Sequence, residues 1–336
     1  MRPRSIEEYQ VGWVCALPKE LTAARAMLDE EHEEFESRVA QDNNSYILGR
    51  VHGHNVVMAC LPAGVYGTNS AAVVAKDMLR TFTGIRFGLM VGIGGGIPNI
   101  ANGVDIRLGD IVVSEPDGVH SGVVQYDLRK NLGGGIFQRK GFLMQPPTLL
   151  LTALTNLKSQ HAIYGNRISN TLSEMINRLP QLALSGYIHP GSDMDSLCCS
   201  NIQGHKDTLT CSQCRNGMIY REPRLNTSPK VHYGLIASGN ELIKNALERD
   251  RLGQELGAKC VEMEAAGLMN DFPCIVIRGI CDYADSHKND IWQEYASATA
   301  AAFAKELLYV VKPAEATLAQ PSTEITSKLR SESLFN

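Results

Sequence analysis

Three features of the chain have both the chemistry and the placement expected of an active site. Glu20 follows an apolar run at residues 10–17. A cluster of glycines follows a second run at residues 85–91, and Asp282 follows a third at residues 273–281. In open parallel sheets, ligands bind outside the carboxyl ends of the strands. If the three runs are parallel strands of one sheet, these features meet in a single site.

Each acidic residue also has a simpler structural interpretation. Asp282 is a candidate general acid if burial raises its pKa, but on position alone a turn or helix-capping aspartate is the commoner case. Glu20 is a candidate general base, and it is also an acid in the first turn of a predicted helix, where the dipole stabilises it. Glu262 and Glu264 lie in the segment 261–267, at the start of the helix predicted for residues 263–270. At that spacing they point to different helix faces, so at most one should serve the site.

The glycine cluster does not match the common nucleotide-binding motifs. Gly92, Gly94, Gly95 and Gly96 are followed by Ile97, where the dinucleotide fingerprint needs a last glycine or alanine. The lysine and hydroxyl pair of a P-loop is also missing. The cluster therefore indicates either a tight turn or a backbone that a sugar or phosphate approaches closely. A dinucleotide-dependent oxidoreductase is not favoured.

The elements that must position these residues alternate along the chain. Such alternation predicts an α/β fold with a mainly parallel sheet covered on both faces. The predicted strands are residues 10–17, 45–50, 55–60, 85–93, 110–114, 231–238 and 273–281, and the predicted helices are residues 19–31, 70–82, 241–252, 263–270 and 293–310.

Length alone allows either one large or two small domains. The chain has 336 residues, 44% of them hydrophobic, which is enough for a full core. We expect one domain that spans residues 8–312, with a polar, cysteine-rich insertion at about residues 185–230. Residues 313–336 look like a mobile tail.

Charge and cysteine usage restrict the partners and the compartment. The formal net charge of -4 does not favour nucleic acid as a partner. No apolar run is long enough for a transmembrane helix, and the first residues lack the apolar stretch of a secretory signal. Nine cysteines, most of them scattered or in apolar runs, do not indicate a disulfide framework. We expect a reduced, cytoplasmic location and no membrane partner.

The insertion contains a candidate structural zinc site. Its spacing is C-x5-H-x5-C-x2-C, and cysteine and histidine ligands suit tetrahedral zinc. A metal would help a segment with little apolar core to fold. The alternative is a loop of free cysteines, because the spacing is not that of a standard zinc finger. The candidate ligands are Cys199, His205, Cys211 and Cys214.

Five segments together resemble one family. As an ordered set they are similar to the purine nucleoside phosphorylase, uridine phosphorylase and methylthioadenosine/S-adenosylhomocysteine nucleosidase superfamily. The resemblance implies a three-layer α/β/α fold with a mixed, mainly parallel sheet. Residues 117–127, 270–274 and the insertion resemble the fungal branch, where such domains also occur in larger immunity-type proteins. The segments are LMVGIGGGIP (89–98), LGDIVV (108–113), GLIASG (234–239), VEMEAAG (261–267) and RGICDYAD (278–285).

The resemblance implies a role for most of the candidate residues. Asp282 matches the acid that protonates the purine N7 as the base leaves, and Glu264 matches the carboxylate that binds the ribose hydroxyls. Catalysis would need no cofactor. At the position of Leu242, the nucleosidases have an aromatic residue. At the position of Cys281, the family often has a serine. The remaining substrate-binding candidates are Gly92, Ile93, Gly94 and Gly95 in the glycine loop, Ile243 in the base pocket, Met263 at the sugar, and Arg278 beside the acid.

The resemblance also bears on the nucleophile. ALPKEL (16–21) resembles the nucleosidase segment whose glutamate activates water, and Glu20 matches that glutamate. Phosphorylases place glycine and arginine here and use a hydroxyl where Ile93 stands. Hydrolysis of a purine, preferably adenine, nucleoside or nucleotide is therefore favoured. The alternatives are a phosphate-dependent phosphorylase and a nucleoside-binding signalling module without turnover.

The 5′ group of the substrate is left open. Residues 129–140 carry Arg129, Lys130, Arg139 and Lys140. Together with Lys19 and Arg278 they could hold a 5′-phosphate chain. Some immunity-linked relatives are ATP nucleosidases, so ATP is a candidate substrate, whereas a solvated basic loop is the alternative. Relatives build their sites at dimer interfaces, and we expect a homo-oligomer.

Overall fold

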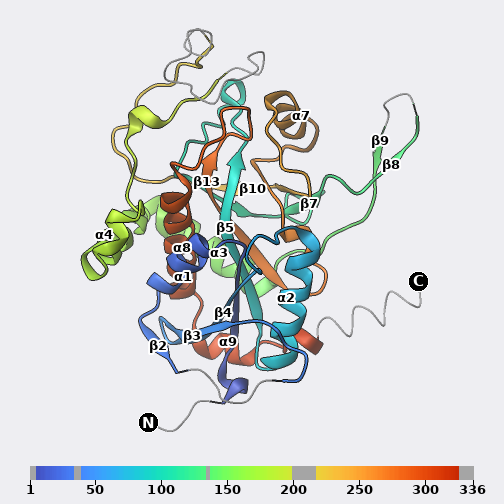
Figure 1. The fold of residues 1–336 in the computed structure, drawn as a ribbon, viewed down its shortest axis with the longest axis vertical. Helices are drawn as coiled ribbons and strands as arrows, with labels where there is room; N and C mark the ends of the chain where they lie inside the picture. Colours follow the sequence, from blue (N-terminus) through green and yellow to red (C-terminus); the bar gives the residue numbers. More distant parts are fainter. Residues whose placement is uncertain (1–4, 34–38, 134–136, 199–216, 325–336) are drawn as a thin grey trace.

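A computed structural model describes residues 5–33, 39–133, 137–198 and 217–324 (Figure 1). The candidate zinc ligands Cys199, His205, Cys211 and Cys214 lie outside these residues. Within the described ranges, no three His, Cys, Asp or Glu side chains are grouped so that they could hold a metal ion. In the same part of the chain, every helix is too short or too polar to cross a membrane.

The described residues form one large mixed sheet, and its middle strands are parallel. The main path runs β10-β6-β13-β5-β1-β4-β3-β2. β5 lies parallel to both β1 and β13, and β1 lies parallel to β4, whereas β6 is antiparallel to β13. The strands of this path are β1 (Val11–Cys15), β2 (Glu30–His32), β3 (Tyr46–Val51), β4 (His54–Cys60), β5 (Phe87–Gly96), β6 (Ile111–Ser114), β10 (Val231–Gly234) and β13 (Cys274–Asp282).

Shorter strands extend the sheet beside the end of β5. β12 pairs antiparallel with β5, and β11 lies parallel to β12 and β7. A separate hairpin of two strands extends away from the sheet (Figure 1). These strands are β7 (Val123–Gln125), β11 (Ile236–Ser238) and β12 (Cys260–Glu262), and the hairpin consists of β8 (Arg129–Asn131) and β9 (Phe137–Arg139).

Helices cover both faces of the sheet, which confirms the predicted three-layer α/β/α architecture. One face packs against the helices α1, α3, α4 and α8, and the other packs against α2 (Figure 1). The helices are α1 (Pro18–Ala26), α2 (Thr68–Thr81), α3 (Thr148–Tyr164), α4 (Ile168–Arg178), α5 (Gln181–Leu184), α7 (Ala246–Leu256), α8 (Gln293–Val310) and α9 (Pro313–Leu318).

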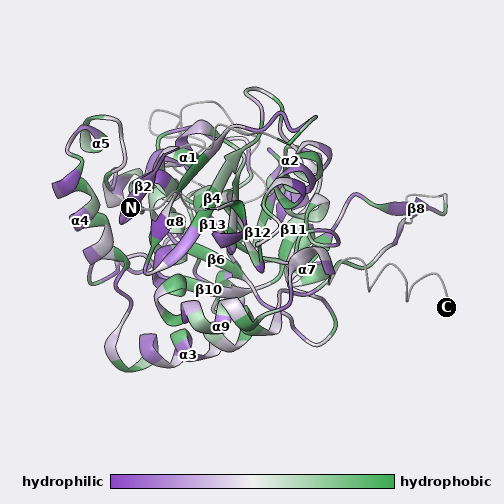
Figure 2. Cartoon of the chain, turned by 90° about the horizontal axis from the view of Figure 1, so that it is seen from below, coloured by the Kyte–Doolittle hydropathy of each residue, from purple (hydrophilic) through white to green (hydrophobic). Residues whose placement is uncertain are grey.

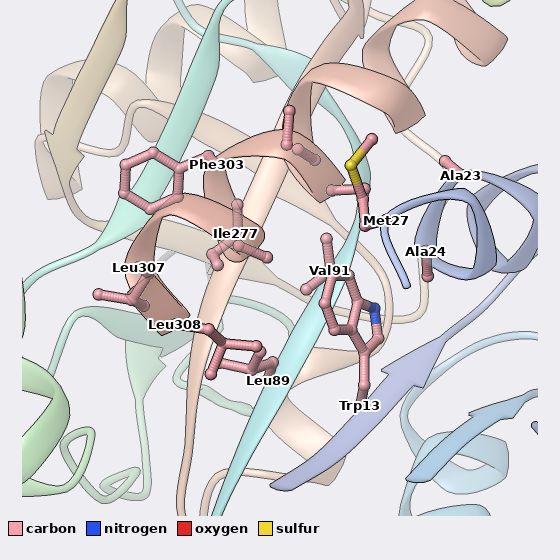
Figure 3. Close-up of a cluster of buried hydrophobic side chains, with 14 of the residues drawn as sticks. Trp13, Ala23, Ala24, Met27, Leu89, Val91, Ile277, Phe303, Leu307 and Leu308 are labelled. Atoms are coloured by element: carbon pink, nitrogen blue, oxygen red, sulfur yellow. The ribbon is translucent and has the colours of Figure 1, made fainter. Parts of the chain in front are cut away.

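Alternating residues of the central strands enter two separate cores. Trp13 and Leu89 face α1 and α8 (Figure 3), whereas their neighbours Val14 and Met90 face α2. The alanine-rich sequence of α8 lets this helix approach β13 closely. A Cβ atom at Gly279 would lie 1.9 Å from the carbonyl oxygen of Ala296. Figure 2 shows hydrophilic residues on the outer side of α4 and on the outlying β8.

Two predicted helices differ from the structure. The helix expected at residues 241–252 begins later, as α7, because the Asn245 side chain accepts the N–H groups of Leu247 and Glu248 and caps it there. The helix expected at residues 263–270 is absent from the described chain. A 3-10 turn, Ala265–Gly267, follows the end of β12 instead.

The two segments expected to break the α/β pattern are partly ordered against the domain. In the insertion, Arg224 forms a salt bridge of 2.6 Å with the buried Asp110, just before β6. Residues 313–324, expected to begin a mobile tail, start with α9, where Ala316 is fully buried. The Ser322 N–H group also donates to the carbonyl of Ile85. Residues 325–336 lie outside the described chain.

Candidate active site

A cavity of about 590 Å³ opens where β1, β5 and β13 end. It lies at the carboxyl ends of parallel strands, where the three features were expected. Glu20 and the glycine cluster line it, whereas Asp282 is not a lining residue and lies behind Gly95 and Cys281. Met263 and Ile243 contribute apolar wall, and Leu242 lies half-exposed at the same cavity. The predicted residues that line it are Glu20, Ile93, Gly94, Gly95, Leu242, Ile243, Met263, Glu264 and Cys281.

Glu20 is held at the cavity wall by backbone N–H groups. Its Oε2 accepts hydrogen bonds from Ala16 N (2.7 Å) and Leu17 N (2.9 Å), and its Oε1 accepts one from Ile93 N (2.8 Å). The residue is 3% exposed, and burial raises its pKa although Arg278 and the three N–H groups oppose this. Glu20 therefore caps its own helix and also presents a carboxylate of raised pKa to the cavity, so the capping role leaves the carboxylate at the site.

The glycines at the end of β5 allow buried side chains to approach the strand. A Cβ atom at Gly92 would lie 2.4 Å from Glu20 Oε1 and 2.5 Å from Arg278 Nη1. At Gly95, it would lie 2.9 Å from Asp282 Oδ1. These glycines belong to an extended strand, so the tight-turn interpretation does not apply. Their missing side chains leave room for the charged groups of the site.

Arg278 lies below the cavity and is not available to a phosphate. It is fully buried, and its Nη2 pairs with both Glu262 and Glu264, the latter at 3.2 Å. The predicted use of Arg278 on a 5′-phosphate is therefore wrong for this structure. The guanidinium instead neutralises part of a cluster of carboxylates, to which Glu20 also belongs electrostatically.

Glu262 was missed by sequence reasoning because a helix was assumed around it. Its carboxylate accepts the N–H groups of Glu264 (3.1 Å) and Ala265 (3.0 Å), which turns the chain at the end of β12. Both acids consequently reach Arg278, contrary to the expectation that they would face apart. Burial raises the pKa of Glu264 to about 7, against the lowering effect of Arg278 and with a further rise from Glu262 and Glu20.

Asp282, the last residue of β13, has a cationic partner that the sequence did not reveal. Its Oδ1 accepts the N–H group of Ala284 (2.8 Å), and its Oδ2 lies 3.1 Å from Cys281 Sγ and 3.0 Å from Lys288 Nζ. Burial lowers the pKa of Lys288, but the neighbouring acids, chiefly Asp282, outweigh burial and raise it, so Lys288 remains charged. Lys288 also lines the cavity. It stands in a polar loop, where neither its type nor its spacing distinguished it.

The other cations predicted to hold a 5′-phosphate are not gathered at this cavity. Lys19 forms a salt bridge of 2.7 Å with Glu294. Arg139 and Lys140 line a different cavity, of about 160 Å³, and Arg129 and Lys130 belong to β8 of the outlying hairpin. Among the described residues, the acids at the main cavity are Glu20, Glu241, Glu262, Glu264 and Asp290, and the lysines are Lys244 and Lys288.

The fold and the cavity agree with a family match over nearly the whole chain. Residues 10–312 match the model of the phosphorylase superfamily. The chain therefore belongs to this superfamily, as the ordered segments indicated.

Two similar proteins have very different lengths. A nucleotide-binding leucine-rich repeat (NLR)-like protein of Hyaloscypha variabilis is 49% identical over 314 residues, which cover 91% of this chain and 30% of the relative. This chain thus spans less than a third of that protein. A 5′-methylthioadenosine/S-adenosylhomocysteine nucleosidase of Mycobacterium bovis is 24% identical over 305 residues, which cover 89% of this chain and 95% of the relative.

Solved structures of nucleoside-cleaving enzymes share the fold. Futalosine hydrolase of Helicobacter pylori has a TM-score of 0.57 at 17% identity, covering 90% of this chain and 99% of that chain. The 5′-methylthioadenosine/S-adenosylhomocysteine nucleosidase of the same organism has a TM-score of 0.56 at 18% identity, covering 90% and 98%.

Proposed function

We propose that the protein hydrolyses the N-glycosidic bond of a purine nucleoside, preferably an adenine nucleoside. The spacing of the two catalytic carboxylates along β5 carries this proposal. The carboxylate of Glu20 borders Gly92, and that of Asp282 borders Gly95. Three residues of a strand span roughly 10 Å at about 3.3 Å per residue. Glu20 lines the cavity, and Asp282 lies directly behind the cavity-lining Gly95 and Cys281. We therefore place the sugar against Glu20 and Glu264 and the base toward Asp282.

The residues then have complementary roles in bond cleavage. Glu264 accepts hydrogen bonds from the ribose hydroxyls, and the surplus of carboxylates stabilises the positive charge that develops on the sugar. As the bond between C1′ and N9 breaks, its electron pair moves to the base, and N7 takes a proton from Asp282. Water attacks C1′ and gives its proton to Glu20. Lys288, which remains charged, stabilises the carboxylate that Asp282 becomes. Solvent then takes the proton from Glu20 and returns one to Asp282.

Two contacts favour water over phosphate as the nucleophile. The N–H group of Ile93, the one phosphate ligand that this position offers, already donates to Glu20. Arg278 is buried and paired with Glu262 and Glu264. A phosphate dianion at this wall would lie beside carboxylates, while the Ile93 N–H group and the Arg278 guanidinium are both already paired. Charge repulsion would therefore disfavour its binding.

The charges of the cavity also bear on the 5′ group. Acids outnumber lysines among the described residues that line it. A nucleoside with an uncharged 5′ group fits these walls better than a nucleotide does. Cleavage of ATP, our other candidate substrate, would require cations other than those that line the cavity in one chain, for example those of the β8–β9 hairpin.

Product analysis tests the proposal. Adenosine, methylthioadenosine, inosine, AMP and ATP are each incubated with the protein, with and without phosphate, and the products are identified by chromatography and mass spectrometry. We expect free base and free sugar regardless of phosphate, with Asp282→Asn as the inactive control. Base released only with phosphate, together with ribose 1-phosphate, would identify a phosphorylase. No base from any substrate would indicate a nucleoside-binding module.

A further inference from the structure

The insertion at residues 185–230 takes no part in the proposed chemistry, yet it contacts the residue next to Asp282. The hydroxyl of Tyr283 donates to Asp195 Oδ1 (2.5 Å) and accepts a hydrogen bond from Arg221 Nη1 (2.7 Å). Arg221 Nη2 also lies 3.0 Å from Asp195 Oδ1, which closes a triangle of hydrogen bonds. Asp195 and Arg221 come from the two separate described parts of the insertion, so both parts are fastened to the end of β13.

Tyr283 is therefore held at several points and cannot turn freely. Its side chain is 3% exposed, and its carbonyl accepts a hydrogen bond from Arg249 Nη1 of α7 (3.1 Å). Burial and Asp195 raise the pKa of Tyr283, against the opposing effect of Arg221, so the phenol keeps the proton that it donates. The Arg221 guanidinium also lies 5.4 Å from the centre of the Tyr283 ring.

The backbone after Tyr283 sets the orientation of the catalytic acid. Ala284 has a φ of 50°, in the left-handed region that residues other than glycine rarely adopt. Its N–H group donates to Asp282 Oδ1, so this hydrogen bond depends on the strained conformation. Such conformations persist only where the surrounding structure holds them in place. Tyr283, anchored to the insertion, is the adjacent residue.

We infer that Asp195 and Arg221 of the insertion are positioning residues for Asp282 and act on it through Tyr283. This inference rests on the proposed function, in which Asp282 protonates the departing base. The insertion would accordingly control the leaving-group step, whereas Glu20 and Glu264, which line the cavity itself, would be unaffected. Asp195 and Arg221 belong to the two sides of the insertion, and both contact Tyr283. A movement of either side would therefore reach Asp282 through the Tyr283 side chain.

Two substrates distinguish this role from a merely structural one. The best purine nucleoside needs a proton on its base, whereas p-nitrophenyl β-D-ribofuranoside has a leaving group that departs without one. In Arg221→Met and in Tyr283→Phe, we expect kcat for the nucleoside to fall roughly ten- to hundredfold, with little change in KM. Cleavage of the p-nitrophenyl riboside should stay within about twofold of wild type if only the leaving-group step is affected. Arg221→Lys, which keeps a cation beside Tyr283, should retain part of the lost activity.

Arg224→Met is the matched control. Arg224 is another part-buried arginine of the insertion, and it pairs with Asp110 rather than with Tyr283. This variant should lower the melting temperature but keep the ratio of the two activities. An unchanged ratio in Arg221→Met and Tyr283→Phe would overturn the inference, as would an equal change of the ratio in Arg224→Met. If Arg221→Met does not fold, Tyr283→Phe decides, since it removes one hydroxyl. A wild-type protein that cleaves neither substrate would instead refute the proposed function, and this inference with it.

Discussion

The Nη2 atom of Arg278 lies 3.2 Å from Oε2 of Glu264, directly below the candidate active site. The same nitrogen pairs with Glu262, and Glu20 is a further electrostatic partner of the guanidinium. One buried cation is thus shared by three buried carboxylates. When all three are ionised, the cluster carries excess negative charge in a site shielded from water. Burial is the main cause of the raised pKa values of Glu20 and Glu264, and for Glu264 the neighbouring Glu262 and Glu20 raise the pKa further.

The stability of the protein should fall as the pH rises from about 4.5 to about 7. In the folded state, the pKa of Glu264 is about 7, above its ordinary value of 4.5, so the folded protein binds more protons in this window. The favourable contribution is fully present below pH 4.5 and is lost as the pH passes 7. At 1.36 kcal/mol per pKa unit, it amounts to about 3 kcal/mol. Urea unfolding at several pH values measures it. Glu264→Gln should flatten the curve, and an equal slope in wild type and variant would contradict this assignment.

The activity should have the opposite pH dependence. Glu264 accepts hydrogen bonds from the ribose hydroxyls only when it is ionised, and Glu20 takes a proton only when it is ionised. Since both pKa values are raised, the acidic limb of the kcat/KM profile should rise with pH through an apparent pKa near 7. Because the two acids interact, this value belongs to the cluster as a whole. If kcat/KM instead rose near pH 4.5, the essential carboxylates of the free enzyme would not have the raised pKa values described for Glu20 and Glu264.

Replacing Glu20 by glutamine should be more disruptive than an isosteric change usually is. Both of its oxygens accept backbone N–H groups, from Ala16 and Leu17 on one side and from Ile93 on the other. Whichever way a glutamine amide turns, its NH₂ group faces a donor, and we expect a loss of about 1–3 kcal/mol in stability. The loss of the base should lower kcat by roughly 10²- to 10⁴-fold. Chemical denaturation and steady-state kinetics measure the two effects separately. Glu241→Gln, at an exposed residue of the same cavity, is the control and should change neither value much.

A single methyl group on the floor of the site should impair catalysis without removing any functional group. In Gly92→Ala, the new Cβ would press against Glu20 Oε1 and Arg278 Nη1, which have to move apart. We expect at least a roughly tenfold loss of kcat/KM from the misplaced base. Gly12→Ala is a matched control, because its Cβ would press against Phe272 and Met78 in the core instead. It should cost about 1–3 kcal/mol of stability and leave kcat/KM nearly unchanged. Equal kinetic effects of the two variants would argue against a specific role of Gly92.

Lys288 should affect the departure of the purine base and not the reaction at the sugar. In Lys288→Met, Asp282 loses the cation 3.0 Å from its Oδ2, so the carboxylate that remains after proton transfer to the base is no longer stabilised. Cleavage of a purine nucleoside should fall by about 10²-fold or more, whereas cleavage of p-nitrophenyl riboside should persist. Lys244→Met removes the other lysine of the cavity, which has no contact with Asp282, and should leave the ratio of the two rates unchanged. A parallel loss on both substrates would show that Lys288 serves the whole cavity.

The fold was predictable from the sequence because its central strands are buried on both faces. Such strands read as continuous apolar runs, and residues 10–17 and 273–281 are runs of this kind. Two of the three features that follow these runs, Glu20 and the glycine cluster, also line the cavity. Asp282 follows the third run at the same end of the sheet. Alternation of strands and helices was thus enough to assemble the candidate site.

The charges of the site were much harder to predict. A sequence gives the type of Arg278 but not its burial, which depends on carboxylates that arrive from β12 and α1. Glu262 was overlooked since its carboxylate bonds to the backbone and converts an expected helix into a strand and a turn. Lys288 lies in a loop without hydrophobic periodicity, so the sequence does not show that its side chain pairs with Asp282. Pairing between side chains from different elements is a property of the folded chain.

The shortage of buried cations at the cavity wall has a consequence for inhibitors. A ribose analogue with a permanent positive charge in its ring would provide the counterion that Glu20, Glu262 and Glu264 lack when Arg278 is shared among them. Its affinity should increase as the cluster ionises, whereas an uncharged analogue of the same shape should bind with little dependence on pH. A pair of such compounds would thus report the protonation of this buried cluster, even when the domain is embedded in a longer polypeptide.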